Sequence, residues 1–166
     1  MPAPYYTFTA GPVQFFALDT NEVSDAQLFW LKSELARSRA PWKLVYGHHP
    51  IYSAGVHADS QELIKRLLPI LKGRVDVYLA GHDHDLQHLK EDGGVHFFVA
   101  GGGGAGLREP TSGPRSLFAK AAHAFCVVEA DNKQLKVRFV DVELNQLYQA
   151  TLIKTGANAV LYQSAK

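Results

Sequence analysis

Three histidines occupy positions where a folded chain could use them together to bind a metal ion. His48 follows the apolar segment 42–46, while His82 and His84 follow the apolar segment 75–80, and a glycine separates each segment from its first histidine. In an extended backbone, residues two apart face the same side and lie roughly 6.5–7 Å apart at Cα. With metal–nitrogen bonds of ~2.0–2.1 Å, His82 and His84 could share one ion or serve two adjacent ions. The alternative is a polar loop.

The residues around these histidines give weaker signals. In the same extended geometry Asp83 points away from the metal, and Asp85 is available to accept an N–H from a ligand ring. The glycine-rich loop 101–114 could turn backbone N–H groups toward a phosphate, or be only a mobile loop, because it lacks the Gly-Lys-Ser/Thr of phosphate loops. Structural or solvated roles are expected for His88, His96, His123, Arg108 and Arg115.

The elements that must position these residues alternate between strand and helix. Helical periodicity covers 24–38, where Ser24 and Gln27 form a capping pattern, and 60–71, where Pro69 should kink or end the helix. Strand patterns cover 5–9, 13–18, 42–46, 75–80 and 96–100, followed by 124–130, 135–142 and 146–153. The order β-β-α-β-α-β and then a β meander predicts an α/β fold. Segments 42–46 and 75–80 should be neighbours, with ligands bound beyond their carboxyl ends.

Composition and charge limit the classes of protein to which this chain can belong. The chain has 166 residues, 46% of them hydrophobic and 20% charged, which suits one globular domain over 1–155 with a tail over 156–166. A formal net charge of +1 gives no field for nucleic acid or a membrane surface, so we expect neither as a partner. No signal peptide or membrane-length apolar run is visible, and the compartment stays unknown. The single cysteine, Cys126, should be a buried small hydrophobe.

Longer segments resemble a known family. Gly47-His48-His49-Pro50 and Gly81-His82-Asp83-His84 resemble two of the five metal motifs of calcineurin-like metallophosphoesterases. The segments GHHPIYSAGVHADS, RLLPIL, VDVYLAGHDHDLQHL and FFVAGGGG resemble the C-terminal half of purple (tartrate-resistant-type) acid phosphatases. The similarity runs from about residue 5 to 153, and implies part of an α/β/β/α sandwich.

The resemblance also implies roles for single residues. His48 and His82 would ligate the divalent metal, and His84 the other ion, which is iron(III) in the purple enzymes. His57 falls where the family places a histidine that contacts the substrate phosphate and helps protonate the leaving group. The reaction is phosphomonoester hydrolysis, in which two metal ions, iron with iron, zinc or manganese, stabilise an in-line displacement.

Three further family motifs are absent from the sequence. They are Asp-x-Gly (or Asp-x-His), Gly-Asp-x-x-Tyr and Gly-Asn-His, which supply aspartate, tyrosine and asparagine ligands. Histidine is a neutral ligand, and two cations ~3.5–4 Å apart repel strongly without carboxylates. We therefore expect this chain alone to hold at most one ion and to be inactive or weakly active. We also expect a truncated or split gene product, whose N-terminal half would supply the missing ligands.

Three functions compete at this point. The first is the C-terminal half of a metal-dependent phosphomonoesterase. The second is a non-catalytic metal-binding or interaction module on the same scaffold. The third is a metallophosphoesterase for diesters or nucleotides, against which His57 argues mildly.

Overall fold

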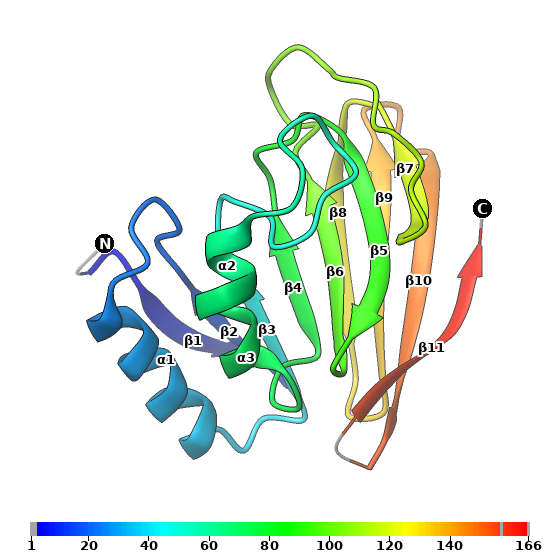
Figure 1. Cartoon of the computed structure of the whole chain (residues 1–166). Coiled ribbons are helices and arrows are strands. Elements are labelled where there is room, and N and C mark those ends of the chain that lie inside the picture. Colours follow the sequence, from blue (N-terminus) through cyan, green and yellow to red (C-terminus); the bar gives the residue numbers. More distant parts are fainter. Residues whose placement is uncertain (1–2, 157, 166) are drawn as a thin grey trace.

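The structure, a computed structural model, describes residues 3–156 and 158–165, which form two β-sheets and three helices (Figure 1). The helices are α1 (Asp25–Arg37), α2 (Gln61–Arg66) and α3 (Leu68–Leu71). The larger sheet contains, in spatial order, β1 (Tyr6–Ala10), β2 (Val13–Ala17), β3 (Trp42–Tyr46), β4 (Val77–Ala80), β6 (Val95–Ala100), β5 (Leu86–Asp92) and β7 (Ser116–Lys120). The smaller sheet contains β11 (Asn158–Ala165), β10 (Gln146–Thr155), β9 (Gln134–Asp141) and β8 (Ala124–Ala130).

The chain is layered as helices, larger sheet and smaller sheet. Neighbouring residues of a strand point to opposite faces of a sheet, so a strand buried on both faces is apolar throughout. In β3, Val45 belongs to the core shared with Leu31 of α1, whereas Leu44 belongs to the core shared with Phe98 and with Phe139 of the smaller sheet. The α/β class predicted from the alternation of elements is confirmed.

The middle of the larger sheet is parallel, and this brings the candidate histidines together. Strands β2, β3, β4 and β6 run parallel to one another. Tyr46 at the end of β3 pairs in register with Leu79 near the end of β4. The predicted adjacency of segments 42–46 and 75–80 is therefore confirmed, and both strands end at the same edge of the sheet.

The N-terminal hairpin and α1 form as predicted. The hydroxyl of Ser24 accepts a hydrogen bond from the backbone N–H of Gln27 at 3.2 Å, which caps the first turn of α1. The predicted helix over 60–71 is instead divided at Leu67 into α2 and α3. Pro69 explains the division, because it has no N–H to continue the hydrogen bonding of α2 but fits the first turn of α3.

Three strands were missing from the predicted pattern, namely β5, β7 and β11. Strand β5 carries Gln87 and His88, which are polar but fully buried, so its sequence lacks the expected alternation. The segment 156–166, predicted as a tail, forms β11 over its described part 158–165 and pairs antiparallel with β10. Backbone hydrogen bonding to a long neighbouring strand stabilises β11 there, and its own pattern does not reveal it. Cys126 is partly buried against the core between the sheets.

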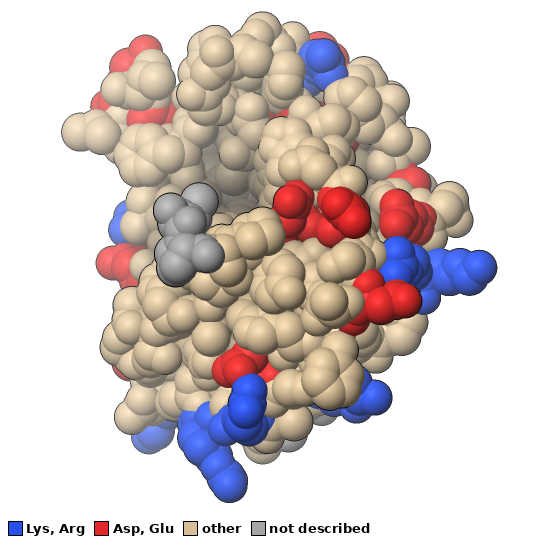
Figure 2. Space-filling view, turned by 90° about the vertical axis from the view of Figure 1, so that its left-hand side faces the viewer, with Lys and Arg blue, Asp and Glu red and all other residues tan. Residues whose placement is uncertain are grey.

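One side of the molecule exposes the edge of the larger sheet. Strand β1 is the terminal strand of that sheet, and Phe8 on it stacks on Phe15 at 4.9 Å while remaining 44% exposed. Figure 2 shows this side, with a hollow in its upper part walled mainly by uncharged residues and with lysines and arginines gathered toward the bottom. Among the described residues no helix is long and apolar enough to cross a membrane.

Candidate metal and phosphate site

The site lies on two turns that are hydrogen-bonded to each other. One turn follows β3 and the other follows β4. The N–H of Gly47 donates to the carbonyl of Leu79 at 3.2 Å, and the N–H of Gly81 donates to the carbonyl of His48 at 3.1 Å. These two bonds extend the parallel pairing beyond the strands, so the backbone fixes His48 and His82 relative to each other.

Gly47 is required because Thr20 packs against it. A Cβ atom at Gly47 would lie 2.5 Å from Cγ2 of Thr20, closer than such contacts allow. The Thr20 hydroxyl accepts a hydrogen bond from the backbone N–H of His49 at 2.9 Å and is also bonded to Nδ1 of the His49 ring at 3.0 Å. Because Gly47 has no side chain, Thr20 can approach it closely, and Thr20 in turn positions His49.

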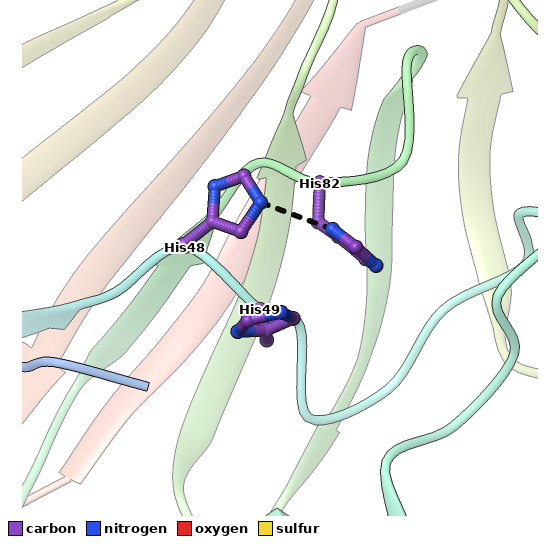
Figure 3. Close-up of side chains that lie close together, drawn as sticks. All are labelled: His48, His49 and His82. Atoms are coloured by element: carbon purple, nitrogen blue, oxygen red, sulfur yellow. Dashed lines mark hydrogen bonds between the residues drawn. The ribbon is translucent and has the colours of Figure 1, made fainter. Parts of the chain in front are cut away.

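Three histidines converge beyond these turns: His48, His49 and His82 (Figure 3). One ring nitrogen of each lies within 4.8 Å of the others. Nε2 of His48 is 3.0 Å from Nδ1 of His82, close to the roughly 3.3 Å between two nitrogens that share a tetrahedral ion. This set of donors fits a metal ion that prefers imidazole.

The environment favours the neutral form of two of these rings. Burial, together with the neighbouring histidines His57, His49 and His48, lowers the pKa of His82. Burial and then His48 lower the pKa of His49. Because a metal binds only the unprotonated nitrogen, both effects keep ligand lone pairs available toward lower pH.

His84 does not join this cluster. Its Nδ1 is bonded to the carbonyl of Gly106 at 2.9 Å. The prediction that His82 and His84 face the same side assumed an extended backbone. His82 instead has φ +67°, in the left-handed region. Whether His84 ligates a metal stays a prediction.

His57 lies beside the cluster. Its ring is 4.0 Å from the ring of His82, between centroids, and its Nδ1 is 2.7 Å from Oδ1 of Asp83. Sequence alone gave no geometric reason to connect residues 57 and 83; the loop after β3 folds back over the turn after β4 to do so. The predicted catalytic residue is therefore adjacent to two predicted metal ligands, and its role remains a prediction.

Asp83, and not Asp85, is the carboxylate that bonds a histidine ring at this site, and that ring belongs to His57 outside the cluster. Asp83 is 1% exposed and also accepts a hydrogen bond from the hydroxyl of Ser53. Burial alone would raise the pKa of Asp83, but hydrogen bonds from Ser53 and His57 outweigh it and hold that pKa below its usual range. Asp85 is buried elsewhere and accepts from Nε2 of Gln87 at 2.8 Å.

The glycine-rich loop places the guanidinium group of Arg108 beside this site. The N–H of Arg108 donates to the carbonyl of His84 at 3.1 Å, and Nη1 of Arg108 is 3.3 Å from Nε2 of His57. Arg115 instead lies over the ring of Tyr52, with its guanidinium carbon 4.0 Å from the centroid. Of the two arginines expected to be solvated, Arg108 is thus positioned to meet an anion at His57.

A pocket of about 300 Å³ opens at the histidines, lined by His49, Pro50, His57, Ala58, Ser60 and His82. A larger pocket of about 450 Å³ borders Arg115 and contains no histidine among its lining residues. We place the candidate site in the smaller pocket, because of these two it is the one lined by the converging His49 and His82 and by the neighbouring His57. Three other histidines lie outside this pocket. His88 bonds the hydroxyl of Tyr148 at 2.7 Å, and His96 and His123 bond backbone carbonyls.

Comparisons with known proteins agree with this geometry. A model of the calcineurin-like phosphoesterase family matches residues 5–86. Purple acid phosphatase 7 of Arabidopsis thaliana is 33% identical over 92% of this chain and 55% of its own length. Tartrate-resistant acid phosphatase type 5 of Sus scrofa is 32% identical over 76% of this chain and 40% of its own length. The chain thus spans about half the length of the curated relatives it matches.

Solved structures share the fold. GAP50, described as the anchor in the inner membrane complex of Plasmodium, matches with a TM-score of 0.78 and 28% identity, over 93% of this chain and 56% of its own. Purple acid phosphatase PPD1 from yellow lupin matches with a TM-score of 0.74 and 19% identity, over 82% of this chain and 30% of its own. The chain belongs to the calcineurin-like phosphoesterase family and is homologous to the purple and tartrate-resistant acid phosphatases.

Proposed function

We propose that this chain forms the histidine side of a metal-dependent phosphomonoesterase site. An N-terminal half carrying the three absent motifs would supply the aspartate, asparagine and tyrosine ligands. The complete site would hold two ions, iron with iron, zinc or manganese, through His48, His82 and His84 and those added ligands. The chain alone would hold at most one.

The observation that carries this proposal is the placement of His57. A histidine that is not itself in the ligand cluster lies against a ligand ring, 4.0 Å from that of His82, and is oriented by a buried carboxylate at 2.7 Å. An acid–base group beside a metal, held in one orientation, is the arrangement that ester hydrolysis needs. Homology to acid phosphatases supports the same class of reaction.

The ions, when bound, would polarise the phosphoryl group and compensate the charge that develops during displacement. Nε2 of His57, which faces away from Asp83, accepts from Nη1 of Arg108 in the structure; when Arg108 turns to the phosphate, Nε2 would take up a proton and donate it to the leaving oxygen. Arg108, whose Nη1 is 3.3 Å from that nitrogen, would bind a phosphate oxygen and orient the ester. Homology to acid phosphatases supports monoesters over the diester alternative.

The lack of negative charge among the histidine ligands explains why this half of the site is insufficient for turnover. The ligand cluster found among the described residues consists of three neutral histidines, and the nearby carboxylate of Asp83 is already bonded to Ser53 and His57. A second cation ~3.5–4 Å from the first would meet strong repulsion without a bridging carboxylate. Turnover therefore requires anionic ligands from outside this cluster.

Hydrolysis of p-nitrophenyl phosphate tests the proposal. The chain alone should stay near background, and mixing it with an N-terminal half that carries the three missing motifs should restore turnover. His48→Ala or His82→Ala should then lower turnover by about 100-fold or more, because each removes a ligand. His123→Ala is the matched control, because His123 bonds the carbonyl of Gly102 outside the cluster, and it should leave turnover unchanged.

A second candidate function is an interaction module without catalysis. The match to GAP50, described as an anchor, at a TM-score of 0.78 favours this alternative. A mixture that stays inactive, while both halves associate and bind metal, would support the module and reject the phosphomonoesterase.

A further inference from the structure

We propose that His49 is a metal ligand, and that this chain by itself holds one zinc-class divalent ion between His48, His49 and His82, with His84 outside the ligand set. The ion would occupy the divalent position of the proposed function. Its binding by the chain alone does not require turnover.

The first argument is convergence. His48 and His49 lie on the turn after β3 and His82 on the turn after β4, and their rings face a common space (Figure 3). The pair His48–His82 is separated by 3.0 Å, and all three donor atoms lie within 4.8 Å of one another. Nitrogens bound to one tetrahedral ion are roughly 3.3 Å apart.

The second argument is the support given to His49. The Thr20 hydroxyl contacts both the backbone N–H and Nδ1 of His49, at 2.9 and 3.0 Å, and Thr20 is itself only 8% exposed. Hydrogen bonds of this kind commonly orient metal-bound histidines. His49 is therefore restrained toward the cluster.

The third argument excludes His84 from this ion. Its Nδ1 bonds the carbonyl of Gly106 at 2.9 Å, and its ring nitrogens are not among the described donor atoms that lie within 4.8 Å of one another. In the arrangement observed, His49 takes its place.

The donor set selects the kind of ion. Three neutral imidazoles suit zinc, cobalt, nickel or copper, whereas magnesium prefers oxygen ligands. Three protein ligands also leave a fourth position open for water or an anion. His57, with its ring 4.0 Å from that of His82, borders the same space. The open position should therefore accept inorganic phosphate as an additional ligand.

Calorimetric titration of the metal-stripped full-length chain with zinc, and with cobalt for its visible spectrum, tests this inference. We expect one equivalent bound and none for magnesium. His49→Gln should weaken zinc binding by about 100-fold or more, because loss of an outer partner alone costs roughly 10–100-fold. His123→Gln, the matched control, should change it by less than about threefold, because His123 bonds the carbonyl of Gly102 outside the cluster, and His84→Gln should weaken it far less than His49→Gln does.

A measurement on the unaltered chain keeps the test independent of folding in the variants. Zinc should shift the ring NMR signals of His48, His49 and His82 and leave those of His84 in place. The inference is overturned if His84→Gln weakens binding as much as His49→Gln, if two equivalents bind, if the His84 signals shift instead, or if no zinc binds. None of these results depends on whether the mixed halves hydrolyse phosphate.

Discussion

Nδ1 of His57 lies 2.7 Å from Oδ1 of Asp83, and this contact fixes which nitrogen of His57 faces the pocket. With Nδ1–H directed at the carboxylate, Nε2 is left toward Arg108 at 3.3 Å. A carboxylate that accepts from one ring nitrogen of a histidine sets the tautomer and the orientation of the ring. Asp83 therefore acts on the proposed chemistry through His57.

Replacing Asp83 by asparagine should lower turnover by the mixed halves about 10–100-fold with little change in KM. The amide retains the shape but can present an N–H in place of an acceptor oxygen, so it no longer fixes the orientation and tautomer of His57. Nitrogen NMR of the chain alone should show His57 changing from a single tautomer to a mixture. Ser53→Ala is the control, because Ser53 bonds the other oxygen of the same carboxylate. An equal loss in Ser53→Ala would assign the effect to the packing of Asp83 instead.

Removing the guanidinium of Arg108 should weaken substrate binding more than turnover. A charged hydrogen bond to phosphate at this exposed position contributes about 1.5 kcal/mol. Arg108→Ala should thus raise KM for p-nitrophenyl phosphate about tenfold and weaken inhibition by phosphate similarly, with kcat within about threefold. Arg115→Ala should change neither constant, since Arg115 lies over Tyr52. A kcat that falls while KM stays constant would contradict a role in binding.

The buried His88 should make the fold sensitive to acid. Burial between the sheets lowers the pKa of His88 to about 3, against an ordinary value of 6.5. The unfolded chain therefore binds the proton first as pH falls, and the stability that neutral His88 contributes is lost progressively between about pH 6.5 and pH 3. At pH 5 this group should cost about 2 kcal/mol of unfolding free energy.

Urea denaturation at pH 7 and pH 5 measures that loss. His88→Phe keeps a flat ring that can stack on Phe98, as the His88 ring does at 4.1 Å between centroids. The variant should lose about 2 kcal/mol less than the unaltered chain between the two pH values, whatever its stability at pH 7. Equal losses in the two proteins would show that His88 does not titrate in the unfolding transition.

Substitution of Gly47 should destabilise the chain through Thr20. Gly47→Ala places a methyl group 2.5 Å from Cγ2 of Thr20 and should cost about 1–3 kcal/mol of unfolding free energy. Thr20→Ser removes Cγ2 and keeps the hydroxyl that binds His49, so the double variant should recover most of the loss. Thermal or urea unfolding of the four proteins in the cycle gives the coupling. Simple additivity would show that the contact is not the cause.

Elements with local signals were predictable. Segment 42–46 is apolar throughout and forms β3 over those same residues, and Ser24 with Gln27 marks the start of α1. Strand β5 was not predictable, because Gln87 and His88 look like surface residues while tertiary contacts bury them. Strand β11 depends on its pairing with β10, which the residues 158–165 do not reveal by themselves.

The position of the candidate site could be predicted from the sequence, but the residues that form it could be predicted only in part. The glycine–histidine turns at two neighbouring strand ends located it. The left-handed backbone of His82 could not be read from residue types, and neither could the convergence of His49 with His48 and His82. The pairing of His57 with Asp83 depends on how the loop after β3 folds, which local patterns do not encode.

The hydrogen bonds that join Gly47 to Leu79 and Gly81 to His48 involve the main chain alone. The pairing of the two turns therefore does not depend on the histidine rings they carry. Replacing the histidines would leave these bonds in place, so the edge of the sheet and the chemistry that it displays are separable.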